Sequence, residues 1–168
     1  MLKDHAKVML FLLQAGEVVG RKKLQKMIYI SKKMDIPFSE RFKFHMFGPY
    51  SEELSLRMEE LCNLGFVMER MEDKGNYQQY RYSLSEQGLH FLELNPQQWP
   101  DQRELFHSLN DQSAKFLELV STLLYFSELS KEEVKEKVFT LKRKQNYSEE
   151  DIEKAHQFIK QLRKNVSL

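Results

Sequence analysis

One stretch, residues 61–92, constrains the fold of this chain more than any other part of the sequence. It begins as the end of a helix, and Phe66–Met71 then reads as a short, half-buried β-strand. Asp73–Asn76 contains the glycine and asparagine that suit a tight hairpin tip. Tyr77–Leu84 alternates apolar and polar residues, and Ser85 is a suitable cap for a following helix. We therefore expect a β-hairpin between two helices.

The residues before this hairpin predict three helices. Asp4–Ala15 is apolar on nearly every side, which is typical of a helix buried in the middle of a domain. A short turn between two glycines leads to a second helix, Arg21–Met34, as in a helix-turn-helix. Arg41–Phe47 alternates as a short strand, and after a Gly-Pro-Tyr turn Ser51 caps a third helix that ends at Leu64. Three helices followed by a hairpin predict a winged helix-turn-helix over residues 1–94.

The rest of the chain is expected to be a helical extension. Asn95–Pro100 contains two prolines and is the clearest internal boundary. Beyond it, apolar residues at helical spacing predict three helices, Gln112–Leu129, Ser130–Lys144 and Ser148–Lys164. The expected fold class is α+β and mostly helical, with a winged-helix-like module over 1–94 and this extension over 95–168. The apolar stripes of the extension either cover the first module or pair with a second copy in a homodimer.

The composition is that of a globular protein without a strong overall charge. Hydrophobic residues make up 41% and charged residues 30% of the 168 positions. The net charge is only +1, so no global field draws the protein onto nucleic acid or an anionic membrane. The longest apolar run, Val8–Leu13, is far shorter than the ~18–20 residues of a membrane span. We expect a cytoplasmic protein in which the sole cysteine, Cys62, packs in a helix core.

Catalytic, metal-binding and cofactor-binding sites have little support. The five histidines are scattered and form no His-x-x-x-His pair. The six glycines punctuate turns, and none belongs to a phosphate-binding loop. Ser51 and Ser85 suit helix caps better than nucleophiles. The sequence therefore predicts a protein that is not an enzyme and holds no metal or cofactor.

Charged residues on the helices and the hairpin are the candidate contacts to a partner. The third helix would enter the major groove of duplex DNA, but it starts with Glu52 and Glu53 and has Arg57 as its only cation. The second helix has the basic face instead, which suits phosphate, an acidic partner protein or plain solvation. Lys142–Lys144 is expected to be a solvated helix end. The basic candidates on the second helix and the hairpin are Arg21, Lys22, Lys23, Lys26, Arg70, Lys74 and Arg81.

Two short motifs carry a resemblance to known families. Residues 24–29 read Leu-Gln-Lys-Met-Ile-Tyr, and residues 47–51 read Phe-Gly-Pro-Tyr-Ser. This part of the chain resembles the Panacea domains of SocA-like antitoxins, and the whole chain is similar to the YwgA-like proteins of Gram-positive bacteria. The resemblance implies a cytosolic module that binds another protein, such as a toxin or a protease-delivered target. Tyr29 and Tyr50 are therefore candidate contacts to a partner. The alternative is a role in the core, in which Tyr29 packs against the Gly48–Tyr50 turn and sets the angle between two helices.

The leading hypothesis is a non-enzymatic winged-helix interaction or regulatory protein, antitoxin-like or adaptor-like, whose chief partner is another protein. The alternative is a dimeric transcription regulator that binds duplex DNA through the third helix and the hairpin. The two differ in salt dependence, because a DNA-binding protein loses about 0.9 log units of affinity per log unit of salt for each phosphate that it neutralises.

Overall fold

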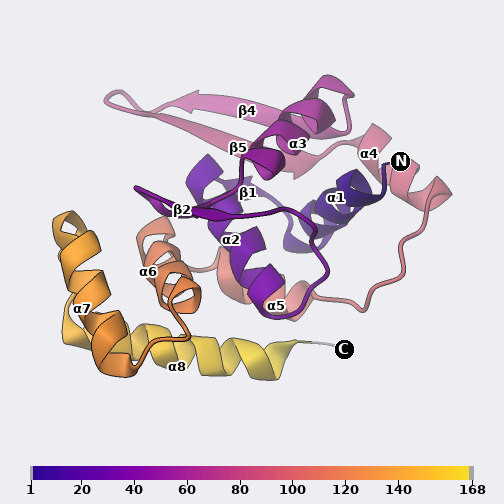
Figure 1. Cartoon of the computed structure of the whole chain (residues 1–168). Helices are drawn as coiled ribbons and strands as arrows, with labels where there is room; N and C mark the ends of the chain where they lie inside the picture. The colour runs from indigo at the N-terminus through magenta and orange to yellow at the C-terminus, as the bar shows by residue number, and fades with distance from the viewer. Residues whose placement is uncertain (1, 167–168) are drawn as a thin grey trace.

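The computed structural model describes residues 2–166, and its elements alternate helices with short strands before ending in helices only (Figure 1). The α+β, mostly helical class is confirmed. The elements are α1 (Lys3–Ala15), β1 (Val18–Val19), α2 (Arg21–Lys33), β2 (Lys43–His45), β3 (Gly48–Tyr50), α3 (Glu52–Asn63), β4 (Val67–Asp73), β5 (Gln78–Leu84), α4 (Glu86–Leu94), α5 (Arg103–Asn110), α6 (Ala114–Tyr125), α7 (Lys131–Leu141), the short 3₁₀ helix η1 (Arg143–Gln145) and α8 (Glu149–Asn165).

The predicted hairpin is confirmed and belongs to a three-stranded antiparallel sheet. β4 pairs with β5 in a continuous register from Val67 opposite Leu84 to Asp73 opposite Gln78. β1 pairs with the other side of β5, which gives the strand order β1-β5-β4. Gly75 lies at the hairpin tip with a positive φ of 94°, a conformation that glycine adopts without strain.

The helices that flank this hairpin begin at the predicted caps. The Ser51 hydroxyl accepts a hydrogen bond from the backbone N–H of Leu54 at 3.0 Å, and Ser85 does the same for Gly88 at 3.0 Å. Such bonds satisfy amide groups that have no partner within the first turn of a helix. Local sequence chemistry therefore fixes where α3 and α4 start.

A second, two-stranded hairpin lies between α2 and α3, and it differs from the prediction. The expected strand Arg41–Phe47 is limited to Lys43–His45, and the expected turn Gly48–Tyr50 is itself a strand, β3, paired with β2. The chain reverses at Met46 and Phe47 instead. The segment between α2 and α3 is therefore a short two-stranded hairpin that projects beside α6 (Figure 1).

The C-terminal part contains four α-helices within the described residues, so the predicted number of three was wrong. The helix that was missed is α5, Arg103–Asn110, which buries Leu105, Phe106 and Leu109. α5 packs against α1 and α2, and α6 lies along α2 (Figure 1). α7 and α8 pack on the outer side of α6. The extension is thus docked on the first module within one chain, and one apolar core spans both.

No helix within residues 2–166 is both long enough and apolar enough to cross a membrane.

Candidate functional site

The Leu-Gln-Lys and Gly-Pro-Tyr-Ser motifs meet in a set of backbone-directed hydrogen bonds. The amide of Gln25 donates to the carbonyl oxygen of Ser51 and accepts from its N–H, both at 2.9 Å. One residue on, Lys26 Nζ donates to the carbonyl oxygen of Pro49 at 3.0 Å. The role of holding β3 against α2, which the sequence suggested for Tyr29, is therefore carried by Gln25 and Lys26. The Tyr29 ring packs edge-on against Phe42, with centroids 5.1 Å apart.

Lys26 belongs to a buried polar group that we call the lysine–glutamate cluster, composed of Lys26, Glu118, Lys142 and Tyr147. Lys142 Nζ donates to the carbonyl oxygen of Met46 at 2.8 Å and lies 4.0 Å from Glu118 Oε1. The Tyr147 hydroxyl lies 3.3 Å from Glu118 Oε2. The cluster joins the β2–β3 hairpin to the C-terminal helices.

Two predictions about lysines are corrected by this cluster. Lys26 was expected on an exposed basic face, either solvated or in contact with a partner, yet only 2% of it is exposed. Lys142 was expected at a solvated helix end, and it is equally buried. Burial of lysine is tolerated here because each ammonium group donates to a backbone carbonyl oxygen and shares the Glu118 carboxylate nearby.

We expect Lys26 to make the protein more stable as the pH rises above neutrality. Burial lowers the pKa of Lys26 from its ordinary value of 10.5 to about 8, and burial also lowers that of Lys142. Between about pH 8 and pH 10.5, the two pKa values of Lys26, the unfolded chain binds more protons than the folded one. The free energy of unfolding therefore rises by up to about 1.4 kcal/mol per pH unit for this lysine. Burial raises the pKa of Tyr29, which opposes the effect only at higher pH.

Urea unfolding at a series of pH values from about 7.5 to 9.5 measures this slope. Lys26→Met should flatten the rise, because the variant no longer carries the buried amine. Lys154→Met is the matched control, since Lys154 is exposed and should leave the slope unchanged. An identical slope in wild type and Lys26→Met would contradict the assigned pKa.

A groove of ≈ 730 Å³ lies between α2, the β2–β3 hairpin, α3 and one face of β4 and β5. A cavity of this size can take a small ligand or a few side chains of a partner. Its lining is mixed, with apolar and aromatic side chains beside both signs of charge. The groove is lined by Arg21, Lys22, Leu24, Gln25, Lys26, His45, Met46, Phe47, Tyr50, Ser55, Met58, Glu59, Cys62, Asn63, Glu69 and Tyr82.

The turn of the β2–β3 hairpin forms an exposed apolar tip beside the groove. Met46 is 79% exposed and Phe47 is 42% exposed. The ammonium group of Lys22 lies 3.3 Å from the centre of the Phe47 ring, and the His45 and Tyr50 rings lie 5.2 Å apart. The sequence predicted one strand over Arg41–Phe47, so this exposed tip was recognised only once the structure placed a turn at Met46 and Phe47.

The predicted basic residues of α2 do not form an open basic face. Arg21 lies over the Tyr80 ring at 3.8 Å, donates to the Tyr82 hydroxyl at 3.0 Å and lies 3.6 Å from Glu69. The hydrogen bond with Tyr82 raises the pKa of Arg21. Lys23 donates to the carbonyl oxygen of Asn110 on α5. Each cation is therefore engaged by the protein itself.

The cations of α3 and of the β4–β5 hairpin are also paired, in contrast to the free contacts that the sequence suggested. Arg57 is nearly buried and forms an ion pair with Glu40. Arg70 and Arg81 both reach Glu17, at 3.5 Å and 2.6 Å. Glu72 pairs with Arg81 and lies 3.5 Å from Lys74.

The acidic candidates lie at the start of α3. Glu52 is exposed, whereas Glu53 accepts hydrogen bonds from the backbone N–H and the guanidinium of Arg41, at 3.0 Å and 3.2 Å. These bonds lower the pKa of Glu53. The N-terminal end of α3 is thus acidic, which disfavours contact with phosphate groups.

Cys62 lines the groove and is half-buried rather than enclosed in the core. Burial raises the pKa of its thiol to about 11, so the thiol is protonated near neutral pH. A protonated thiol is a poor nucleophile and a poor metal ligand. Within residues 2–166, no group of three or more histidine, cysteine, aspartate or glutamate side chains could hold a metal ion.

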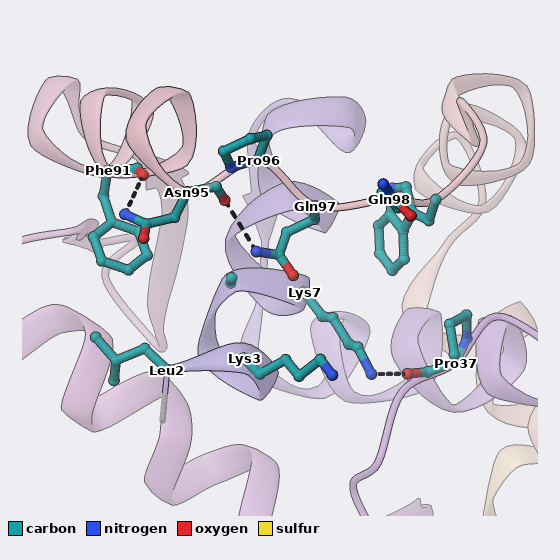
Figure 2. Close-up of a pocket in the computed structure, with 11 residues that line it drawn as sticks. Leu2, Lys3, Lys7, Pro37, Phe91, Asn95, Pro96, Gln97 and Gln98 are labelled. Atoms are coloured by element: carbon teal, nitrogen blue, oxygen red, sulfur yellow. Dashed lines mark hydrogen bonds between the residues drawn. The ribbon is translucent and has the colours of Figure 1, made fainter.

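A second cavity, of ≈ 670 Å³, lies between α1 and the segment that joins α4 to α5 (Figure 2). Lys3 and Lys7 extend along one side of it, and Gln97 comes from the opposite side. Lys7 Nζ donates to the carbonyl oxygen of Pro37 at 2.8 Å, and Gln97 Nε2 donates to that of Asn95 at 3.0 Å. This cavity shares no lining residue with the groove, so the two are separate. None of the predicted candidate residues lines it.

The fold and the groove define a small α+β protein whose helical core carries two hairpins. The chain is similar to the uncharacterized protein YwgA of Bacillus subtilis (strain 168), with 56% identity over 163 residues that span 97% of this chain and 98% of that protein. The chain therefore belongs to the YwgA-like family. No protein-family model matches it, so the resemblance to Panacea domains is not shown. No solved structure matches it either.

Proposed function

We propose that this protein is a non-enzymatic, cytoplasmic winged-helix interaction protein that binds another protein, in an antitoxin-like or adaptor-like role. The winged-helix assignment is supported by the element order. α1, β1, α2 and α3 precede the β4–β5 hairpin, and the strand order β1-β5-β4 brings the first short strand beside the returning one. The β2–β3 hairpin is then an insertion between the second and third helices.

The choice of a protein partner over DNA is supported by the charges. The cations that would contact phosphate on the hairpin, Arg70, Lys74 and Arg81, already lie against Glu17 and Glu72. To bind DNA, these arginines and lysines would have to exchange carboxylates for phosphates beside an acidic α3, which opposes binding. Mixed charges beside apolar side chains suit a protein surface better.

The single observation that carries the proposal is the exposed tip of Met46 and Phe47 beside the groove. The hairpin that presents these side chains is anchored from both sides, by Lys26 through Pro49 and by Lys142 through Met46. Two adjacent exposed apolar side chains on an anchored backbone, next to a cavity, are a suitable anchor for a partner.

Affinity capture from host lysate, with mass spectrometry, tests the proposal. The double variant Met46→Ser, Phe47→Ser should lose at least about 90% of the captured partner, since truncating a central apolar anchor costs about 2 kcal/mol or more. The matched control is Leu94→Ser, which removes a similarly exposed apolar side chain at the end of α4. Equal capture by both variants would show that Met46 and Phe47 do not contact the partner.

A gel shift with duplex DNA tests the rival function. We expect no shift even at low salt. Binding that weakens steeply as salt rises, or capture from lysate that disappears after nuclease treatment, would replace the proposed function with DNA binding.

A further inference from the structure

The cavity between α1 and the segment that joins α4 to α5 combines positive charge with apolar surface. Lys3 and Lys7 extend along its α1 side (Figure 2), and none of its described lining residues is an aspartate or a glutamate. The net charge of the whole chain is only +1, so two cations without a lining carboxylate are a local concentration of charge. The apolar part of the lining consists of Leu2, Ala6, Pro37, Phe91, Pro96 and Trp99.

The helical repeat of α1 places both lysines on one face. Lys3 and Lys7 are four residues apart, a spacing that puts two side chains one above the other on a helix. The short side chain of Ala6 lines the cavity beside them. In Figure 2 the ammonium ends of both lysines point toward the side of the cavity where Pro37 lies. One ligand can therefore meet both groups.

These cations retain the capacity to bind a ligand. Lys3 is exposed and makes no hydrogen bond or ion pair with any residue between 2 and 166. Lys7 Nζ donates to the carbonyl oxygen of Pro37 and lies 3.9 Å from Asp4, but an ammonium group has three N–H donors. Asp4 does not line the cavity, and its carboxylate also lies 3.9 Å from Arg57 on α3. The positive charge on the α1 side is thus only partly compensated within the chain.

The opposite wall is held in place by contacts with the core. Trp99 packs edge-on against Phe38, with ring centres 5.5 Å apart, and its ring centre lies 6.1 Å from that of Phe106. Further along the same segment, the backbone N–H of Gln102 donates to Gln14 Oε1 at 3.1 Å. A wall anchored in this way forms the cavity before a ligand arrives, so that binding costs little ordering of the protein.

We propose that this cavity binds a small organic anion, with a carboxylate or phosphate head group at Lys3 and Lys7 and an apolar body against Phe91 and Trp99. Ammonium groups form their strongest hydrogen bonds with such anions, and they disfavour a cationic ligand. The apolar wall favours a body that leaves water on binding. The cavity volume of ≈ 670 Å³ lies within the range of about 300–1,000 Å³ that is usual for small-molecule sites. This site is additional to the exposed tip and does not depend on the proposed function.

Fluorescence of Trp99 reports binding directly, because Trp99 is the sole tryptophan and lines the cavity. Titration of the whole chain at low salt with octanoate, or with octyl phosphate, should give a saturable change. Octylamine has the same body with the opposite charge and should give none, nor should acetate or inorganic phosphate. From butyrate to octanoate, the affinity should rise by up to about fourfold for each methylene group that is buried.

A charge reversal at the free cation tests the position of the head group. Lys3→Glu should weaken the binding of octanoate and of octyl phosphate by about tenfold, since an attraction becomes a repulsion. Lys154→Glu on α8 is the matched control, because Lys154 is also exposed and lies outside the cavity lining. NMR with ¹⁵N labelling locates the ligand independently, through shifts of the Trp99 indole N–H and the Gln97 side-chain amide.

Three results would overturn the inference. They are the absence of a saturable change with either anion, binding of octylamine or octanol as tight as that of octanoate, and equal affinities of Lys3→Glu and Lys154→Glu. Failure here is distinct from failure of the proposed function. The double variant Met46→Ser, Phe47→Ser should bind octanoate as the wild type does, because neither residue lines this cavity.

Discussion

Replacing Glu118 by glutamine is expected to lower the free energy of unfolding by about 3–5 kcal/mol. The Glu118 carboxylate lies 4.0 Å from the Lys142 ammonium group, and its charge favours the protonated form of both Lys142 and Lys26. Glutamine keeps the size of the side chain and its contact with Tyr147 but removes the charge. Two buried ammonium groups would then face each other without a counter-charge, which is strongly unfavourable in a medium of low dielectric constant.

Urea unfolding followed by circular dichroism at neutral pH measures this loss. Glu93→Gln on α4 is the matched control, because Glu93 is exposed and its neutralisation should change stability by less than about 0.5 kcal/mol. Adding Lys142→Met to Glu118→Gln should recover part of the loss, since it removes one of the unpaired cations. Equal midpoints for Glu118→Gln and Glu93→Gln would show that the cluster does not stabilise the fold.

The parts of the fold that were predicted correctly depend on local chemistry. Ser51 and Ser85 cap helices through their own hydroxyl groups, and each hydrogen bond reaches only three residues along the chain. The hairpin around Gly75 likewise follows from a permissive turn between two short strands. The sequence identified the cations of the hairpin, but it did not show that carboxylates of the same chain pair with them. Glu17, which pairs with Arg81, lies 64 residues away in the sequence.

The parts that were missed depend on contacts between distant segments. Lys26 and Lys142 were both expected at the surface because lysine is rarely buried. The carbonyl oxygens of Pro49 and Met46 that accept their hydrogen bonds cannot be located from the sequence. The strand Gly48–Tyr50 contains a proline and a glycine, both of which favour turns, and it exists because Gln25 holds its end. Tertiary contacts override the local preference here.

The missed helix α5 had a usable signal. Leu105, Phe106 and Leu109 recur at helical spacing, but the helix is only eight residues long and follows a segment with two prolines. A short helix after prolines is easily read as part of a loop. The omission mattered for the fold, because α5 provides the surface through which the extension packs against α1.

Phe106→Ala is expected to lower the free energy of unfolding by about 3–5 kcal/mol, the usual loss when a fully buried phenylalanine is truncated. The Phe106 ring is completely buried, with its centre 4.9 Å from that of Phe11 on α1 and 6.1 Å from that of Trp99. Truncation leaves a cavity at the junction between the first module and the extension. Phe139→Ala on α7 is the matched control, because that ring is partly exposed.

Unfolding should be followed by circular dichroism and by the fluorescence of Trp99, the sole tryptophan. Because one apolar core spans the first module and the extension within residues 2–166, both signals should change at the same urea concentration, in the wild type and in the variant. If Phe106→Ala shifted the fluorescence transition alone, the extension would unfold separately from the first module. The β2–β3 hairpin would then lose its anchor at Lys142 before the sheet unfolds, and a partner that binds the exposed tip would be released at that stage.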